Sequence, residues 1–465
     1  MTQGMLVGYT SDLSVLNDFE RDLVLLAFRE IQLGDYFQNP RRTSLKDVIA
    51  WRLEEGQVIG LHLRHLHSIP HFLDELPSVR ELIIFAEDLD PLPTFPWVSR
   101  LVLVNMGLGV RMVDWGNQPS LRMLQLIGFQ PPSNKELGDL EILSMRRMHF
   151  DVLSDRILKT RLIRLELSNI TGNINPVLEL ETLEDLEVFI ADVRLDLTGI
   201  SRLKRLKTLI LFDVGLNFVP EEIGELRELE YLDLGKNNLY RLPETLGNLH
   251  SLKILKLRGN RIKSLPESLG RLKQLIEVDF RETYISQVPA FFGRLPNLFR
   301  LQLEQVDLEE MPPLNLRRLV YLSFFECYGR FLPYSVWSAT DLTTLLVWQT
   351  PIKEIPPSIG NLRMLRWLFL RETSVDSLPA EIGNLVHLEK LNIENCPLRT
   401  LPTEITRLRN LEFISVHSLV LESFPEGVAT MPNIQRIELY VGSDCLLPAD
   451  VLENPKGITI YVKRD

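Results

Sequence analysis

Residues 229–251 read LEYLDLGKNNLYRLPETLGNLHS, and residues 252–274 read LKILKLRGNRIKSLPESLGRLKQ. Both fit the frame L-x-x-L-x-L-x-x-N-x-L-x-x-L-P-x-x-[IL]-G-x-L-x-x. Eleven prolines recur at the same place in the frame between Pro220 and Pro448, and nine of the ten steps between them are 23 residues; the step from Pro312 to Pro333 is 21. A fixed period of this length indicates one supersecondary unit stacked many times.

The frame resembles the leucine-rich repeat in its 23-residue intracellular form, whose signature is L-x-x-L-x-L-x-x-N. The resemblance implies an α/β solenoid, a leucine-rich-repeat horseshoe with a parallel β-sheet on the concave face and turns or short helices on the convex face. Strand alternation agrees, because it points Leu232 and Leu234 inward and Tyr231, Asp233 and Gly235 outward. The recurrent glycines of the return segment are expected to permit turns or close approach between coils.

The repeats are expected to occupy residues 58–465, with about 19 strands and a regular frame from residue 206 onward. Between 79 and 206 the boundaries could shift by about two or three residues. The expected repeat starts are Val58, Val79, Val98, Leu121, Leu140, Leu162, Leu183, Leu206, Leu229, Leu252, Leu275, Leu298, Leu319, Leu342, Leu365, Leu388, Leu411, Ile434 and Gly457.

Residues 1–57 do not follow the frame and are expected to form an N-terminal cap. Residues 12–33 have apolar side chains at helical spacing, and residues 49–53 read as a hairpin strand before the first repeat. A solenoid needs such a cap, because its bare end exposes core and strand edge. The alternative is that the helix docks a partner. Its apolar positions are Leu16, Phe19, Leu23, Leu26 and Ile31.

The ninth frame position departs from the family. In the regular part it is asparagine only at Asn237 and Asn260, and in the seven units that follow it is Thr, Cys, Val306 or Leu419. In the family this asparagine bonds to backbone, which Thr and Cys can partly reproduce and Val and Leu cannot. Thr or Cys here also resembles the repeats of plant intracellular immune receptors. However, no G-x-x-x-x-G-K-[ST] nucleotide-binding loop is present.

Composition favours a cytoplasmic protein. The net charge of −11 disfavours binding to nucleic acid or anionic membrane, which needs clustered Lys and Arg. No signal-peptide pattern and no apolar run of about 18 residues occurs. The three cysteines are an odd count, which fits a reducing compartment. A monomer is expected.

No pattern indicates catalysis, and neither a cofactor nor a metal is expected. The cysteines lie in separate repeats without a recognisable histidine partner, so a structural role is expected for each. Four histidines fall within ten residues, at positions 62, 65, 67 and 71. A metal site is conceivable there, but the strand and its return path would separate these side chains, so a solvated or capping cluster is favoured.

The outward strand face carries the functional signal. Frame positions three, five and seven point outward, and neighbouring strands lie about 4.8 Å apart, so equal positions stack side by side. From Leu298 onward these positions gather aromatic and apolar residues with basic residues beside them. Such a composition is typical of protein-binding hot spots. The expected partner-binding residues are Arg300, Tyr321, Phe325, Leu346, Trp348, Trp367, Phe369, Arg371, Lys390 and Phe413.

Two alternatives apply to this face: the rings could merely shield one another, or the register could be wrong beside the 21-residue unit. A second, weaker run of outward aromatics, Phe85, Phe189 and Phe212, falls mostly where the frame is less regular.

The sequence predicts a non-enzymatic scaffold or adaptor for protein–protein interaction, acting in intracellular signalling. Its resemblance to Ras-associated leucine-rich-repeat proteins implies a small GTPase or another signalling protein as partner. The alternative is a small-molecule or peptide sensor using the same aromatic face. An enzyme is a third class, for which no constellation of residues was found.

Overall fold

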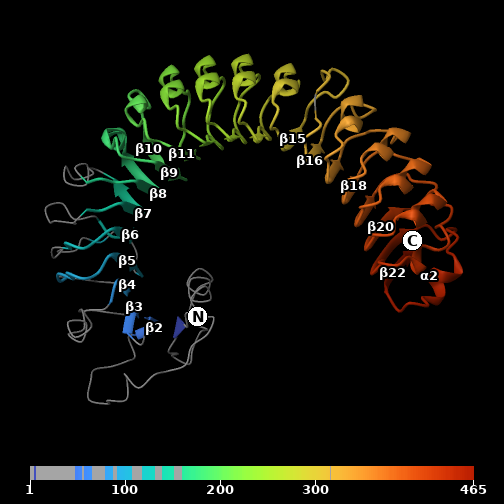
Figure 1. The fold of residues 1–465 in the computed structure, drawn as a ribbon, viewed down its shortest axis with the longest axis horizontal. Helices are drawn as coiled ribbons and strands as arrows, with labels where there is room; N and C mark the ends of the chain where they lie inside the picture. Colours follow the sequence, from blue (N-terminus) through green and yellow to red (C-terminus); the bar gives the residue numbers. More distant parts are fainter. Residues whose placement is uncertain are drawn as a thin grey trace, which may run out of the picture. The chain divides into compact units, whose positions relative to one another are not determined.

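The computed structural model describes residues 5–6, 48–54, 57–64, 79–86, 92–106, 111, 118–130, 139–150, 160–314 and 316–464. The chain forms two compact units, Met1–Gly215 and Leu216–Asp465. Both are built mainly from short parallel strands that follow one another from repeat to repeat (Figure 1). The chain is therefore a solenoid built on parallel β-structure.

The N-terminal unit begins with antiparallel pairing. Strand β1 pairs with β2, which in turn pairs with β3. Strands β3 to β9 and then β11 pair in parallel in chain order, and β10 makes a second, short parallel pairing with β8. The bounds are β1 (Met5–Leu6), β2 (Val48–Glu54), β3 (Gln57–Arg64), β4 (Glu81–Ala86), β5 (Arg100–Asn105), β6 (Met123–Ile127), β7 (Ile142–Phe150), β8 (Arg164–Asn173), β9 (Asp185–Phe189), β10 (Asp192–Arg194) and β11 (Thr208–Phe212), with 3-10 helices η5 (Asn175–Glu179) and η6 (Ile200–Arg202).

The β2–β3 pairing has the antiparallel arrangement expected of the N-terminal hairpin. The helix expected over residues 12–33 lies outside the described residues. The role of residues 1–57 as a cap therefore stays a prediction.

The C-terminal unit alternates strands with return segments. Strands β12 to β22 pair in parallel in chain order. Within this unit the strands lie along the inner side of the curve and the helices along the outer side (Figure 1). The strands are β12 (Tyr231–Asp233), β13 (Ile254–Lys256), β14 (Glu277–Asp279), β15 (Arg300–Glu304), β16 (Tyr321–Phe325), β17 (Thr344–Trp348), β18 (Trp367–Arg371), β19 (Lys390–Glu394), β20 (Phe413–Ser418), β21 (Arg436–Val441) and β22 (Thr459–Arg464).

Most return segments form a 3-10 helix directly after the repeat proline, which has extended backbone and serves as the N-cap residue. The 21-residue repeat at Leu298 has no helix among its described residues, so its shorter return path is irregular. The helices are η7 (Glu221–Glu225), η8 (Glu244–Asn248), η9 (Glu267–Arg271), η10 (Ala290–Arg294), η11 (Tyr334–Ser338), η12 (Pro357–Asn361), η13 (Ala380–Asn384), η14 (Thr403–Arg407), η15 (Val428–Thr430) and α2 (Ala449–Glu453).

Every expected repeat from Val79 onward starts its strand at the third frame position, including those between 79 and 206. Positions four and six are the core, as Leu345 and Val347 of β17 illustrate, because both are fully buried. Inward and outward positions therefore follow the predicted alternation, and no shift of the frame occurs in the irregular region.

The ninth position bonds to backbone where its side chain allows. The Asn237 amide donates to the carbonyl of Leu234 (2.9 Å) and accepts from the N–H of Leu216 (3.0 Å). Thr350 reproduces part of this, donating to the carbonyl of Trp348 (3.1 Å) and accepting from the N–H of Cys327 (3.2 Å). The family's turn hydrogen bonds are thus partly retained without asparagine.

The placement of Leu419 in this inward series was wrong. Leu419 is exposed, and Ser418 occupies the buried place, donating to the carbonyl of Leu398 (2.8 Å). The cause is backbone conformation: β20 remains extended through Ser418, whereas the repeats from Leu121 to Leu388 turn into the left-handed region at position eight.

The left-handed turn at position eight was not predicted. From Leu121 to Leu388 each repeat has a positive φ there, although only Gly128 and Gly259 are glycine. A left-handed conformation costs an L-residue about 1–2 kcal/mol, and it is least suitable for a β-branched side chain. The remaining positions are Arg147, Asn169, Ile190, Asp213, Lys236, Glu282, Gln305, Glu326, Gln349, Glu372 and Asn395.

Replacing Ile190 by asparagine is expected to raise the free energy of unfolding by about 1 kcal/mol, because asparagine tolerates the left-handed region. Ile190 has a φ of 47° and is 58% exposed, so little packing is lost. The measurement is denaturant unfolding. The matched control is Ile163→Asn, an exposed isoleucine without positive φ; an equal gain in both variants would contradict the explanation.

Candidate functional site

The strand register brings the expected partner-binding residues into three parallel rows on one face of the C-terminal unit. In the third-position row, Arg300, Tyr321, Thr344, Trp367 and Lys390 are successive neighbours, and Phe413 follows. The fifth-position row contains Ser323, Leu346 and Phe369, and the seventh-position row contains Phe325, Trp348 and Arg371. We call the apolar centre of this face the aromatic patch: Tyr321, Phe325, Leu346, Trp348, Trp367 and Phe369.

The seventh-position row is a continuous stack. The rings of Phe325 and Trp348 meet edge to face, with centroids 5.0 Å apart. The Arg371 guanidinium lies 4.7 Å from the Trp348 ring centroid, and its Nε lies 3.6 Å from a carboxylate oxygen of Glu394. The Trp348 ring therefore has packing partners on both sides within the chain itself, Phe325 on one strand and Arg371 on the other.

The third-position row repeats this pairing of a ring with a cation from an adjacent strand. Arg300 lies 4.0 Å from the ring centroid of Tyr321, and the Lys390 ammonium lies 5.0 Å from that of Trp367. Further along, Arg436 lies 5.9 Å from the ring of Phe413.

Both tryptophans remain accessible despite these contacts. Trp348 and Trp367 are each 40% exposed, while Leu346 and Phe369 between them are half-buried. The apolar face is therefore open but ordered. The structure brings the ten expected residues together; their binding of a partner stays a prediction.

The ring–cation pairs themselves were missed at sequence level, although a signal existed. An aromatic residue and a basic residue stand at the same frame position of adjacent repeats in Trp367 and Lys390, and again in Trp348 and Arg371. Because equal positions become neighbours about 4.8 Å apart, this alternation was sufficient to predict cation–π contacts.

One flank of the patch is a charged network. Burial alone would raise the pKa of Asp279, but hydrogen bonds and charge from Arg281 outweigh it, so the pKa is lowered. Nearer the patch, burial raises the pKa of Glu304. Asp279 and Arg281 form an ion pair of 2.7 Å. Asp279 and Arg281 thus neutralise one another at this flank of the face.

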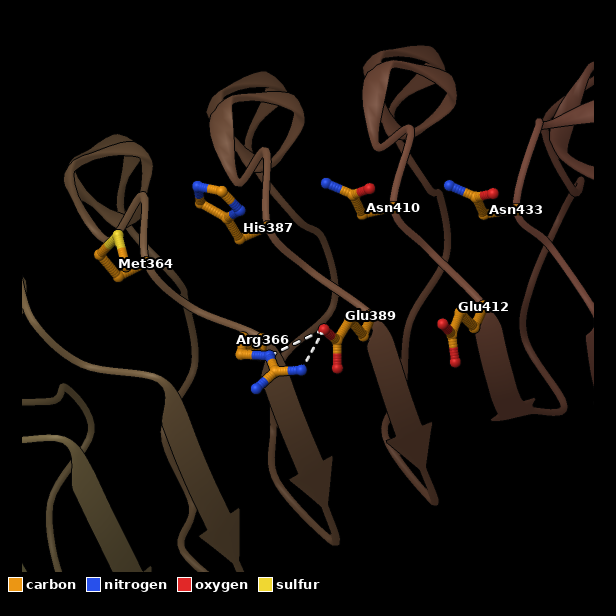
Figure 2. Close-up of a pocket in the computed structure, with 7 residues that line it drawn as sticks. All are labelled: Met364, Arg366, His387, Glu389, Asn410, Glu412 and Asn433. Carbon is orange, nitrogen blue, oxygen red and sulfur yellow. Dashed lines mark hydrogen bonds and ion pairs between the residues drawn. The ribbon is translucent and has the colours of Figure 1, made fainter.

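A separate pocket of about 280 Å³ lies at the beginning of β18, β19 and β20, not on the strand face (Figure 2). Arg366 and Glu389 form an ion pair across it, with a shortest distance of 2.5 Å. Asn410 donates to the carbonyl of Val386 (2.7 Å). Its polar groups are thus largely occupied with neighbouring repeats. The lining residues are Met364, Arg366, His387, Glu389, Asn410, Glu412 and Asn433.

The cysteines are buried and free. Burial raises the pKa of Cys327 to about 11, so its thiol is protonated at neutral pH. In the described part of the chain no group of three or more His, Cys, Asp or Glu is placed to hold a metal ion. Of the expected histidine cluster, only His62 is among the described residues. No helix within the described ranges is long and apolar enough to cross a membrane.

Comparison with known proteins identifies the repeats. A leucine-rich-repeat model matches residues 204–262, and a leucine-rich-repeat-region model matches residues 358–453. The search of curated proteins finds no match.

Three solved structures have similar folds. A leucine-rich-repeat protein of Leptospira interrogans is 25% identical, with a TM-score of 0.62, over 85% of this chain and 93% of its own. The internalin InlF of Listeria monocytogenes is 17% identical, with a TM-score of 0.57, over 67% and 89%. The plant peptide hormone receptor RGFR1, in complex with RGF2, is 19% identical, with a TM-score of 0.52, over 87% and 75%. With the repeat frame and the parallel strand ladder, these findings show that the chain contains leucine-rich repeats and has the fold of leucine-rich-repeat proteins.

Proposed function

We propose that the protein is a non-enzymatic interaction scaffold that binds a protein partner on the strand face of its C-terminal unit, at the aromatic patch. The observation that carries the proposal is the pair of tryptophans, Trp348 and Trp367, each 40% exposed and each held by a cation from the next strand. Their rings contribute little to the core, which is filled from the opposite face of the same strands.

The composition of the patch supports a protein partner. Aromatic residues and arginine are enriched at the energetically dominant centres of interfaces, and a contiguous exposed apolar area of this kind marks interaction sites in soluble proteins. Pre-ordered side chains lose little entropy on binding, which favours affinity. Arg371 and Lys390 would offer donors to carboxylates on a partner.

The finer proposal follows the resemblance stated above. The partner is a small GTPase or another signalling protein, the scaffold acts as a monomer in the cytoplasm, and neither a cofactor nor a metal takes part. The buried, protonated Cys327 thiol is consistent with a structural role rather than nucleophilic catalysis.

The test is the double variant Trp348→Ala, Trp367→Ala. A partner is first captured on the immobilised full-length protein from native cell extract and purified, and its affinity is then measured by calorimetry. Truncating a hot-spot residue costs about 2 kcal/mol or more, so the double variant is expected to bind at least about 30-fold more weakly. Its unfolding transition is expected to change little.

The matched control is Tyr334→Ala, which removes a strongly exposed ring from η11 on the helix side of the same unit. It is expected to leave affinity unchanged. Retained affinity in the double variant, together with a much earlier unfolding transition, would show that the rings are core. If no protein is captured while a metabolite stabilises the wild type but not the double variant, the sensor function applies instead.

A further inference from the structure

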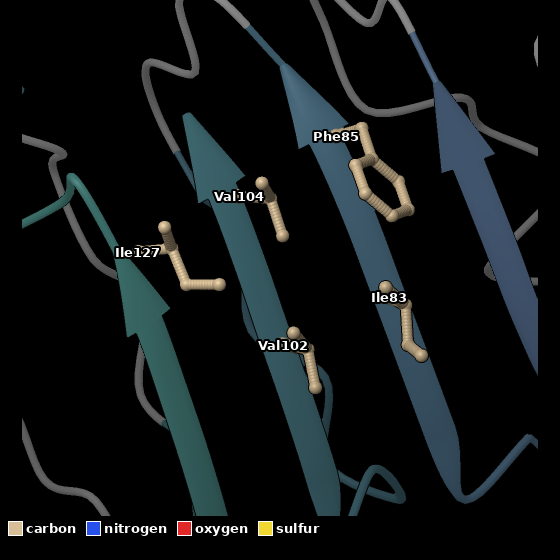
Figure 3. Packing of buried hydrophobic residues seen from close by; sticks show 5 residues of the cluster. All are labelled: Ile83, Phe85, Val102, Val104 and Ile127. Atoms are coloured by element: carbon tan, nitrogen blue, oxygen red, sulfur yellow. The ribbon is translucent and has the colours of Figure 1, made fainter. Parts of the chain in front are cut away.

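The strand face of the N-terminal unit carries a second apolar surface, which we call the N-terminal stripe: Ile83, Phe85, Val102, Val104 and Ile127. These residues project side by side from β4, β5 and β6 (Figure 3). Pairing aligns Phe85 with Val104 and Val104 with Ile127. All five stand at the fifth or seventh frame position, which points away from the repeat core.

The stripe nevertheless has almost no contact with solvent. Its members are 5–8% exposed. Low exposure at the fifth position is common on this face, since even Gln302 is buried. The seventh position is informative, because Phe85, Val104 and Ile127 are nearly covered there, whereas Trp348 at the same position is 40% exposed. Among the described residues outside the cluster, one partly buried hydrophobic, Met106, packs against it. The described residues thus supply one partly buried hydrophobic side chain to a surface of three strands.

The chain itself has a segment of suitable chemistry tethered beside the stripe. Residues 7–47 leave the described chain after Leu6 and rejoin it at Val48. Leu6 pairs with Trp51 in β2, β2 pairs with β3, and β3 pairs with β4, so the Val48 end of this segment is fixed two strands from the stripe and the Leu6 end three strands from it. At about 4.8 Å per strand the stripe begins roughly 10 Å from the Val48 end and roughly 14 Å from the Leu6 end.

Residues 12–33 suit the stripe in pattern and are long enough to cross it. Their apolar positions Leu16, Phe19, Leu23 and Leu26 fall on one side of a helix, with Arg21 on the other. A helix of this length spans about 33 Å, more than the width of three strands. Tethering at both ends raises the effective concentration to the millimolar range, which favours this segment over a free partner or a second copy.

We infer that residues 12–33 dock through their apolar side onto the N-terminal stripe. The segment thus packs on the strand face rather than over the end of the solenoid. That face of the N-terminal unit is occupied by the chain's own segment, which leaves the aromatic patch of the C-terminal unit as the open binding surface. The inference stands apart from the proposed function, since it concerns different residues and is tested without a partner.

The first experiment measures thiol accessibility in the full chain. Val104→Cys places a thiol within the stripe, and the native cysteines are buried, so they give a slow background. Reaction with Ellman's reagent is expected to be slow, and to become at least tenfold faster when Phe19→Asp and Leu23→Asp are added. His417→Cys, at the seventh position of β20, is the control and is expected to react at the same rate with or without the two aspartates. If the Val104→Cys rate does not respond to the aspartates, the inference is wrong.

The second experiment identifies the occupant. Val104→Cys is combined with Leu23→Cys on the apolar side or with Arg21→Cys on the polar side, and disulfide formation is followed on non-reducing gels. The inference expects an intramolecular disulfide that forms at least fivefold faster with Leu23→Cys. Equal rates for the two pairs would refute specific docking. A disulfide-linked dimer as main product would overturn it in favour of a second copy.

Discussion

Replacing Leu345 by alanine is expected to lower the free energy of unfolding by about 2–5 kcal/mol. Leu345 is at the fourth position of β17, fully buried, and flanked on the adjacent strands by Leu322 and Leu368, which are buried as well. Truncation removes three carbon atoms from a packed interior and leaves a cavity that short strands fixed by two neighbours can close only in part. Denaturant unfolding followed by circular dichroism measures the loss.

The matched control is Leu346→Ala, the same change one residue further along the same strand. Leu346 points to the opposite face and is half-buried, so its truncation is expected to cost less than half as much. Comparable losses in the two variants would mean that the outward face is packed like the core. The aromatic patch would then be part of the fold, and the proposed binding surface would lose its basis.

The sequence predicted the strand register because the most regular repeats define a frame that can be extended to the less regular ones. Near-perfect copies at Leu229 and Leu252 define the frame, and a spacing of buried leucines carries it into the less regular repeats. Strands therefore start at the third position even in the repeats at Val98 and Leu121, which lie before the series of recurrent prolines. Inward packing tolerates variation at the other positions, provided that the fourth and sixth stay apolar.

The backbone conformation at position eight could not be predicted from the residue types found there. The left-handed turn at position eight is occupied by residues as different as Lys236, Ile190 and Glu372, because the next coil fixes the backbone regardless of local preference. Backbone conformation also explains why Ser418 rather than Leu419 is buried. In that repeat the strand remains extended through Ser418, and no residue type at this position predicts it.

The candidate site was predictable as a set of rows, but not in its exposure. Frame positions place Trp348 beside Arg371 and Trp367 beside Lys390, since equal positions become neighbours. Exposure depends on what else covers the face. Phe85 and Trp348 share a frame position, yet the first is nearly covered and the second is open. The repeat pattern therefore cannot predict whether residues outside the repeats bury a given part of the strand face.

Replacing Gly247 by alanine is expected to cost about 3 kcal/mol of unfolding free energy, although the change adds only one carbon. Gly247 lies in η8, which packs against η9 of the next repeat. A Cβ at this position would lie 2.5 Å from the Cβ of Ser268 and 2.5 Å from its carbonyl oxygen. Since backbone blocks it, no side-chain rotation relieves the contact, and the two coils must move apart. The expected role of these glycines in close approach between coils is thus confirmed here.

Gly360→Ala is the matched control, because it makes the same change at the same frame position against a looser neighbour. Its added Cβ would lie 3.0 Å from the Asn384 amide nitrogen, 3.1 Å from the Cβ of Glu381 and 3.2 Å from the Glu381 carbonyl oxygen. A shift of a few tenths of an ångström relieves these contacts, and alanine restricts the unfolded chain more than glycine does. The cost at Gly360 is therefore expected to be under about 1 kcal/mol. Both costs are measured by denaturant unfolding. Equal costs for Gly247→Ala and Gly360→Ala would show that backbone freedom determines the requirement for glycine. The expected larger cost at Gly247 would show that the spacing between coils determines it.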